Sequence, residues 1–329
     1  MEEGEGRLLC AEDEIKRAAA IIQKASALVY MTGAGMSCDS GLGTYRGKSA
    51  VDLGEVWPPA KERDIGFYQV AKPRTLLEDP VLVWSYYKMR WDLYKDAKQH
   101  TGYEIMNDWA NRLARKHGTF SFTSNIDGLW LYYHMDTDRY LFPGAPNNVM
   151  EYHGSIKYAQ CTETAVCPHS GTWHAEDQLE RLQVDPKTHL LTGGENAAVP
   201  KCPTCGSIAR LNVFGIGDRA FNEQRRAPQQ QAYDAFKQAT PSGTTADPVV
   251  VVEVGAGRTI PTVRCESAWW VRNKNAILVR INLENAAIQD PAIRDAHIET
   301  DPRHVSIQGL GAASALGAID AHVSGSGWL

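Results

Sequence analysis

The sequence predicts an α/β protein built on a doubly wound, mostly parallel sheet. Short apolar runs of strand length each end in a polar or glycine-containing loop, and segments with helical periodicity connect them. Because the carboxyl ends of parallel strands meet at one edge of a sheet, the loops that follow them are expected to form one ligand site. The predicted strands cover residues 27–32, 119–123, 248–254 and 276–281.

The composition favours a folded enzyme or binding protein over a nucleic-acid or membrane protein. The chain has 329 residues, 43% of them hydrophobic, which is enough for one large domain or two. Its 34 basic and 39 acidic residues give a net charge of -5, so no basic field favours nucleic acid or an anionic membrane as a partner. Residues 1–5 are mostly acidic and have no signal or transit character, and no apolar run is long enough to cross a bilayer. We therefore expect a soluble intracellular protein, cytoplasmic or nuclear and not secreted.

The first strand leads into a glycine-rich turn. Residues 12–25 carry apolar side chains at helical spacing, and acidic residues in the first turn suit the helix dipole. The apolar run 27–32 then breaks into Gly33-Ala34-Gly35, where glycines allow the backbone to approach a ligand closely. Cys38 replaces the third glycine of the dinucleotide fingerprint, so this turn is a phosphate site only in outline.

The next segment reads as a long loop followed by two helices. Residues 48–75 have no regular pattern, and Trp57-Pro58-Pro59 marks a loop that cannot continue regular structure. Asp79 as N-cap and Pro80 at the first helical position predict a helix start. Another helix is expected over 103–117, closed by a glycine before the second strand.

Four of the seven cysteines form a predicted metal site between the second and third strands. The pair Cys202-Pro-Thr-Cys205 has the spacing of a zinc knuckle, and Cys161-x5-Cys167 is a wider first half. Structural zinc on these four thiolates is the favoured interpretation, with His169 or His174 replacing a ligand, or a reduced metal-free set, as alternatives. A four-thiolate site has no open position, so the ion is expected to take no part in catalysis.

Three residues near the expected crevice could perform chemistry. Asn125 and Asp127 follow the second strand, and His153 stands beside a glycine that would let substrate come close. Histidine is the side chain best suited to accept a proton near neutral pH. By pattern alone, a lone histidine is more often structural, and Asp127 is as well explained as a helix cap.

The order of the motifs resembles that of the sirtuin family over roughly residues 12 to 320. The motifs that carry the resemblance are Gly33-Ala34-Gly35-Met36-Ser37, Ser40-Gly41, Arg46-Gly47, Asn125-Ile126-Asp127-Gly128, Tyr152-His153-Gly154-Ser155, the four cysteines, Gly217-Asp218 and Ile281-Asn282.

The resemblance implies a Rossmann-like domain into which a smaller domain is inserted. The Rossmann-like domain would comprise residues 7–47, 103–154 and 213–322. Residues 48–102 would hold the cofactor loop and a helical module, and residues 155–212 a zinc module.

The resemblance also implies that NAD binds across the strand-end loops. The pyrophosphate would rest against Gly33, Ala34 and Gly35, where backbone N–H groups favour anions. Further implied NAD contacts are Ser37, Thr44, Tyr45, Arg46, Ser124, Asn125 at the nicotinamide ribose, Ile126 and Asp127 around the carboxamide, His153, Gly255, Ala256 and Gly257 on the adenosine side, Asn282 at the adenine ribose, Leu283 and Glu284.

The implied activity is NAD-dependent deacylation of protein lysine. In the family, the acyl oxygen attacks the ribose as nicotinamide leaves, and a histidine in the position of His153 serves as general base. The products are lysine, nicotinamide and O-acyl-ADP-ribose. An acyl-lysine protein or peptide would bind as an added strand. Its implied contacts are His153, Val213, Phe214, Gly215, Ile216 and Gly217. The oligomeric state does not follow from the sequence.

The chain departs from the family's motifs in several places, among them the loop 213–218 that would border the acyl-lysine. Residues 41–47 lack the family's proline and aspartate, and Ser124 replaces a glutamine. The aromatic residue of the loop 213–218 is displaced, and Gly257 replaces a serine. NAD cleavage is therefore better supported than the acyl acceptor. A mono-ADP-ribosyltransferase or NAD glycohydrolase is the alternative activity, and a non-catalytic NAD-binding module is the third possibility.

Overall fold

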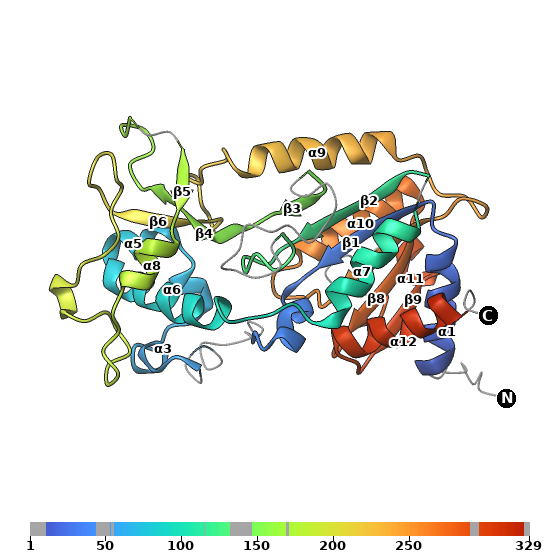
Figure 1. The fold of residues 1–329 in the computed structure, drawn as a ribbon, viewed down its shortest axis with the longest axis horizontal. Helices are drawn as coiled ribbons and strands as arrows, with labels where there is room; N and C mark the ends of the chain where they lie inside the picture. Colours follow the sequence, from blue (N-terminus) through green and yellow to red (C-terminus); the bar gives the residue numbers. More distant parts are fainter. Residues whose placement is uncertain are drawn as a thin grey trace. The chain divides into compact units, whose positions relative to one another are not determined.

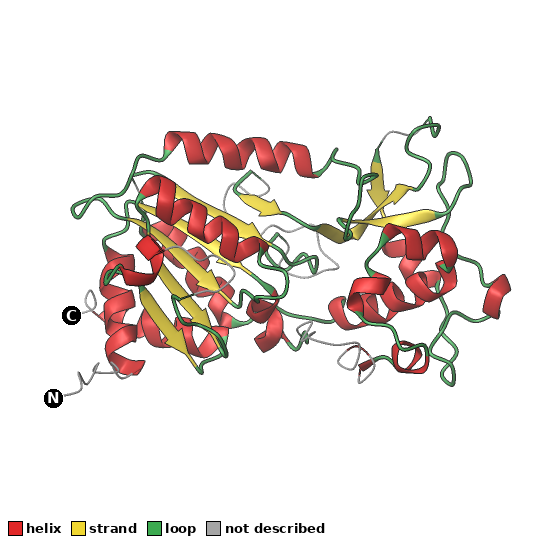
Figure 2. Cartoon of the chain, turned by 180° about the vertical axis from the view of Figure 1, so that it is seen from behind, coloured by secondary structure: helices red, strands yellow, loops and turns green. Residues whose placement is uncertain are grey.

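The computed structural model describes residues 11–43, 53, 56–114, 116–131, 147–168, 171–289 and 296–325 (Figures 1 and 2). The chain divides into two compact units. The first unit comprises Met1–Asp39, Gln99–Phe122 and Ala235–Leu329, and the second Ser40–Lys98 and Thr123–Asp234. Each unit is described by itself.

A parallel sheet forms the core of the first unit. Its strands hydrogen-bond in the order β2-β1-β7-β8-β9, and β1, β7, β8 and β9 run parallel. Every residue of β1 and β7 is buried, which requires cover on both faces of the sheet, so the predicted doubly wound α/β fold is confirmed. The strands are β1 (Ala27–Thr32), β2 (Gly118–Thr123), β7 (Val249–Val254), β8 (Ile277–Asn282) and β9 (Val305–Gln308), while β3 (Val149–Glu151) consists of residues of the second unit.

Helices supply that cover. In the first unit, α1 and α7 each pack against α12, whereas α10 packs on β1, β7 and β8. These elements are α1 (Ala11–Gln23), the 3-10 helix η1 (Ala34–Ser40), α7 (Thr101–Arg112), α10 (Thr262–Lys274), α11 (Ala296–Thr300) and α12 (Ala312–Gly325), while α9 (Arg226–Ala239) includes residues of both units.

The ends of β1 and β7 approach more closely than side chains would allow. A Cβ atom on Gly33 would lie 2.6 Å from the carbonyl oxygen of Gly255, and one on Gly255 would lie 2.3 Å from the carbonyl carbon of Gly35. Gly255 also has a φ of +65°, which L side chains rarely adopt. The N–H groups of Gly33 and Gly35 donate to the carbonyls of Val254 and Gly255, each at 3.0 Å. Glycine is therefore required here by packing, whatever binds above the turn.

A buried ion pair links two neighbouring strands of this sheet. Glu253 of β7 and Arg280 of β8 are register partners, each 1% exposed, with Nε to Oε1 at 2.5 Å. Arg280 also donates to the carbonyl of Ala287 at 2.9 Å. Because a buried charge is tolerated only when it is paired, this contact fixes the loop that follows β8 relative to the sheet.

The second unit combines a small antiparallel sheet with short helices. Its three strands pair in the order β5-β4-β6, and β4 and β6 change register between Gly154 and Ala159. The elements are α3 (Pro58–Glu62), α4 (Phe67–Val70), α5 (Pro73–Glu78), α6 (Pro80–Tyr94), β4 (Gly154–Cys161), β5 (Thr172–His174), α8 (Glu176–Arg181), η2 (Gly194–Asn196) and β6 (Ala209–Val213).

Most predicted elements are confirmed, and two predictions are wrong. Asp79 caps α6 by accepting a hydrogen bond from the N–H of Leu82 at 2.9 Å. The described part of 48–75 is not irregular, since α3 begins at Pro58, where a missing N–H costs nothing. The third predicted helix ends at Arg112 instead of 117, because Leu113 is already extended. The division into a Rossmann-like domain and two modules remains a prediction.

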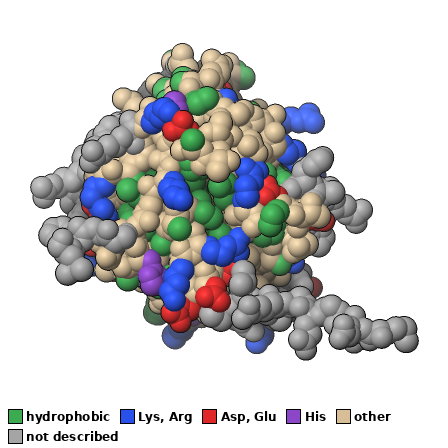
Figure 3. All heavy atoms as spheres, turned by 90° about the vertical axis from the view of Figure 1, so that its right-hand side faces the viewer, with side chains coloured by type: hydrophobic (Ala, Val, Ile, Leu, Met, Phe, Trp, Pro, Cys, Tyr) green, Lys and Arg blue, Asp and Glu red, His purple; other side chains and the backbone are tan. Residues whose placement is uncertain are grey.

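The surface drawn in Figure 3 carries both charge signs. Lysine and arginine side chains are scattered over this face together with aspartate and glutamate. Among the described residues, no helix is both long and apolar enough to cross a membrane. Whether nucleic acid or a membrane is a partner stays a matter of prediction.

The close approach of β1 and β7 predicts that Gly255→Ala is strongly destabilising. Its Cβ would collide with backbone atoms and force a left-handed residue, so unfolding should become easier by about 2 kcal/mol or more. Gly257→Ala is the matched control, because no atom lies within 4 Å of its Cβ position. Urea unfolding should show a lower midpoint for Gly255→Ala alone, and equal midpoints for the two variants would contradict this packing.

Candidate functional site

His153 lies between β3 and β4, where a tight turn brings it against β6. Gly154 has a φ of +76°, and a Cβ there would lie 2.1 Å from the carbonyl oxygen of Asn212. Only glycine permits this approach. The N–H of Phe214 then donates to the carbonyl of His153 at 2.9 Å. The backbone of His153 is thereby joined to the loop 213–217, for which the sequence predicts substrate contacts.

The imidazole of His153 is enclosed by aromatic rings. The ring of Phe214 is nearly parallel to it, with centroids 6.3 Å apart and planes at 19°, and Tyr152 meets it edge-on at 5.1 Å. Both ring nitrogens are shielded from solvent, and neither has a hydrogen-bond partner among the described residues. Burial, and secondarily the cation of Arg226, lower the pKa of His153 to about 4. A neutral, unpartnered imidazole can accept a proton, as a general base must.

The loop after β2 is fixed beside His153 by backbone hydrogen bonds. The N–H of Tyr152 donates to the carbonyl of Thr123 at 2.9 Å, and the N–H of Ile156 donates to that of Ile126 at 3.0 Å. Asn125 and Asp127 in this loop are both buried. The structure therefore brings the three predicted catalytic residues together in the second unit.

Asp127 stabilises a turn. Its Oδ1 accepts a hydrogen bond from the N–H of Leu129 at 3.0 Å, and residues 128–131 do not form a helix. This local bond occupies one carboxylate oxygen. The helix-cap interpretation of Asp127 therefore finds no support in residues 128–131, and a functional role remains a prediction.

The loop 213–217 is fixed to the link between α4 and α5. The N–H of Ile216 donates to the carbonyl of Ala71 at 3.2 Å, and a Cβ on Gly215 would lie 2.5 Å from that same oxygen. Asp218 pairs with Arg210, and its carboxylate accepts the N–H of Ala220 at 3.0 Å. Burial would raise the pKa of Asp218, but the Arg210 contacts outweigh it and the pKa is lowered. The loop is thus held in one conformation from both ends.

The predicted NAD residues of the first unit lie at the ends of β1, β7 and β8. Ser37 is buried with its hydroxyl 3.2 Å from that of Tyr103, and Asn282 donates to the carbonyl of Ala256 at 2.9 Å. The N–H groups of Gly33 and Gly35 are already bonded to β7. These two N–H groups therefore serve the contact with β7, and binding of the pyrophosphate by the turn 33–35 remains a prediction.

The remaining predicted contacts are partly on the surface. Gly257, Leu283 and Glu284 are exposed, and Ser124 is half-buried. The predicted contacts Thr44, Tyr45 and Arg46 and the alternative metal ligand His169 lie outside the described residues.

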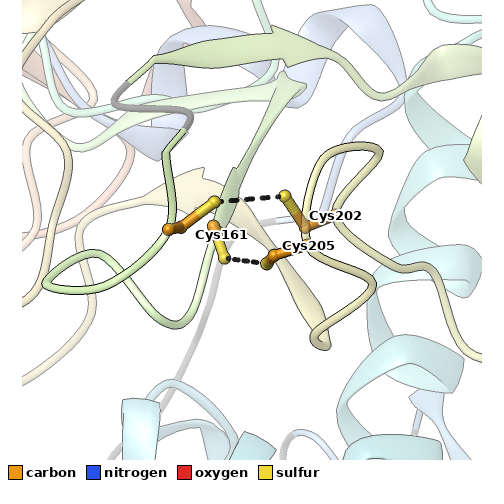
Figure 4. A group of neighbouring side chains, drawn as sticks. Cys161, Cys202 and Cys205 are labelled. Atoms are coloured by element: carbon orange, nitrogen blue, oxygen red, sulfur yellow. Dashed lines mark hydrogen bonds between the residues drawn. The ribbon is translucent and has the colours of Figure 1, made fainter.

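The four predicted cysteine ligands form a compact cluster (Figure 4). Their sulfur atoms all lie within 4.8 Å of one another, with Cys161 to Cys205 at 3.5 Å and Cys167 to Cys202 at 3.7 Å. Zinc–sulfur bonds of about 2.3 Å in a tetrahedron place sulfurs about 3.8 Å apart. The four thiols therefore fit zinc with no position left for a substrate.

The histidine alternative described by the structure is not in this cluster. His174 of β5 has its Nδ1 atom 3.3 Å from the carboxylate of Glu176, and its ring lies against Tyr158. The chain of the knuckle instead turns at Gly206, whose φ is +75° and whose N–H donates to the carbonyl of Cys202 at 3.0 Å. Local backbone geometry thus aims Cys202 and Cys205 at one point.

Sequence reasoning missed two residues beside His153. Arg225 and Arg226 contact the segment that leads into His153, although neither belongs to a motif quoted above. The only available signal was two adjacent arginines at the start of a helical pattern, which by itself predicts a solvated surface.

Comparison with known proteins gives a consistent family assignment. A model of the Sir2 family matches residues 33–239. A protein from Thermococcus sibiricus named NAD-dependent protein deacylase is 28% identical over 276 residues, covering 83% of this chain and 87% of that protein. One of the same name from Pyrococcus furiosus is 28% identical over 270 residues, covering 82% and 86%.

Solved structures share the fold. A complex of a Sir2 homologue with NAD has a TM-score of 0.61 and 20% identity, covering 94% of each chain. Sir2Tm bound to a propionylated peptide has a TM-score of 0.59 and 16% identity, covering 95% of this chain and 98% of that one.

The cysteine cluster predicts about one zinc ion per chain. Cys202→Ser should lose the ion and unfold at a lower temperature, because binding energy of a structural zinc is folding energy. Cys265→Ser is the control, since Cys265 is exposed and outside the cluster. Metal content by mass spectrometry together with thermal melting would test this. A folded, zinc-free wild type whose melting temperature does not change when zinc is added would contradict the prediction.

Proposed function

Since the chain belongs to the Sir2 family, we propose that it is an NAD-dependent protein lysine deacylase. The single observation that carries the proposal is His153, a neutral imidazole with both nitrogens shielded and without a partner among the described residues. A buried polar atom without a partner is costly, so its retention needs an explanation such as a ligand that supplies the missing hydrogen bond. The ribose hydroxyls of NAD can donate a hydrogen bond to such a nitrogen.

The residues fit NAD in two ways. Glycines at the ends of β1 and β7 keep side chains out of the strand-end edge where dinucleotides bind in open α/β sheets. In the second unit, His153 lacks a hydrogen-bond partner among the described residues. When bound, NAD supplies an electrophilic ribose carbon with nicotinamide as leaving group, and its ADP-ribose part accepts the acyl group.

The residues of the second unit would orient the reacting groups. His153 would take the proton of a ribose hydroxyl at its unprotonated ring nitrogen, and the rings of Tyr152 and Phe214 would keep water from that nitrogen. Asn125 and Asp127, buried in the adjoining loop, would hold the nicotinamide riboside. These roles are the ones that the motif resemblance implies, and the contacts around His153 support them.

The acyl-lysine substrate would bind along the loop 213–217. This loop is anchored at Ala71 and at Asp218, so it offers a preformed backbone edge for an extended peptide. The zinc cluster would act at a distance, by holding β4 and β6, the strands that carry His153 and this loop at their ends.

The proposal is tested with a panel of acyl-lysine peptides. Mass spectrometry of reactions with NAD should detect deacylated peptide together with O-acyl-ADP-ribose for at least one acyl group. If ADP-ribose appears on protein or free in solution while every peptide stays acylated, the transferase or hydrolase activity replaces the proposal.

His153→Asn should reduce deacylation by about 10²- to 10⁴-fold, the usual contribution of a general base. His322→Asn is the control, because His322 is an exposed residue of α12. Initial rates at saturating NAD and peptide measure the effect. Equal rates for His153→Asn and wild type would remove His153 from the mechanism.

The lowered pKa of His153 predicts an unusual pH dependence. The neutral imidazole is the active base, so a pKa of about 4 keeps the base form present well below the ordinary histidine value. The acidic limb of kcat/KM should therefore lie below pH 6, provided that enzyme returned to neutral pH regains its activity. A kcat/KM that is half-maximal at about pH 6.5 would instead indicate a histidine exposed to solvent.

A further inference from the structure

Two adjacent arginines, Arg225 just before α9 and Arg226 at its first position, contact the segment that precedes His153. Arg225 forms an ion pair with Glu151, the last residue of β3, whose side chain is 1% exposed. The guanidinium of Arg225 also lies 4.3 Å from the ring centroid of Tyr158 on β4. Arg225 therefore holds the strand that enters the His153 turn to the strand that leaves it.

Arg226 contacts the peptide unit immediately before His153. Its Nη1 donates to the carbonyl of Tyr152 at 3.0 Å, and its Nε donates to Glu223 at 2.7 Å. Its guanidinium lies 4.5 Å from the ring centroid of Phe214, 4.6 Å from that of Phe221 and 5.5 Å from that of Tyr152. An arginine that stacks on three rings and donates to a carbonyl has a defined orientation.

These contacts converge on the enclosure of the imidazole. Tyr152 and Phe214 are the two rings that border His153, and both are also in contact with Arg226. The side chain of Arg226 is only 14% exposed, and its partner Glu223 is half in solvent. Because its charge is paired, Arg226 can remain beside the imidazole without a large desolvation cost.

We infer that Arg226, supported by Arg225, is a positioning residue for His153, which it orients by holding the Tyr152 peptide unit and the rings of Tyr152 and Phe214. The catalytic part of this inference rests on the proposed function, whereas the orientation of His153 does not.

Because charged groups lie around His153, the pKa of its ring can be used to test the inference. Burial is the main cause of the low pKa of His153, and the Arg226 cation lowers it further. The other charged groups on the elements packed against His153 have their own contacts: Glu151 with Arg225 on β3, Asp218 with Arg210 after β6, Glu223 with Arg226 before α9, and Asp127 with the N–H of Leu129 after β2.

The test compares Arg226→Met, Arg226→Lys and the control Arg181→Met, whose arginine is an 81% exposed residue of α8. Two measurements are made on each full-length protein: the NMR titration of the His153 ring and the pH profile of deacylation. Arg226→Met should raise the pKa of His153 toward its ordinary value, lower kcat at least about tenfold and leave the KM for NAD nearly unchanged. Arg226→Lys should keep the low pKa but lose rate, because an ammonium cannot stack and donate as a planar group does.

Each result decides the inference. A titration and a kcat equal to those of wild type in Arg226→Met would overturn it. If Arg226→Met does not fold, Glu223→Gln is the second variant, because it removes the ion pair of Arg226 at an exposed position. It should lower kcat while the pKa of His153 stays low. An unchanged kcat would count against a positioning role of Arg226. If wild type deacylates no peptide yet Arg226→Met shifts the titration, the proposed function fails and the orientation of His153 by Arg226 stands.

Discussion

The close approach of Gly154 to the backbone of Asn212 is the constraint on which the second unit depends. A side chain at Gly154 would place Cβ 2.1 Å from the Asn212 carbonyl, so only glycine lets β4 begin against the end of β6. The close approach of Gly154 and Asn212 therefore brings several features of the second unit onto one small sheet. The His153 turn leads into β4, the loop 213–217 begins at the last residue of β6, and β4 ends at Cys161, one of the four clustered cysteines. A structural metal can thus stabilise a site to which it contributes no chemistry.

The chemistry of His153 follows from exclusion of water. In solvent an imidazole is half protonated at about pH 6.5. The imidazole of His153 is buried between Tyr152 and Phe214, and burial is the main cause that lowers its pKa to about 4. The low value reduces the basicity of the group but guarantees its neutral form at physiological pH. A base of this kind suits a proton that becomes acidic only during the reaction. The paired cation of Arg226 acts in the same direction while fixing the rings.

The sequence predicted features with local causes. The strand β1, the Asp79 cap of α6 and the Cys202–Cys205 knuckle each depend on a few neighbouring residues. The end of α7 was misplaced because residues 113–117 keep helical composition while Leu113 is extended. Arg225 and Arg226 were missed because their partners, among them Glu151 and Phe214, are distant in sequence. For Gly33 and Gly35 the sequence predicted a pyrophosphate contact, which stays a prediction; it did not predict that their N–H groups bond to the carbonyls of Val254 and Gly255.

The central claim is that NAD cleavage is coupled to removal of an acyl group from lysine. The most direct measurement follows nicotinamide and deacylated peptide in the same reaction, by chromatography and mass spectrometry over time. The account predicts equal amounts of the two at every time point, with the acyl group recovered on ADP-ribose. Nicotinamide released in excess of deacylated peptide, or without any peptide consumed, would contradict it.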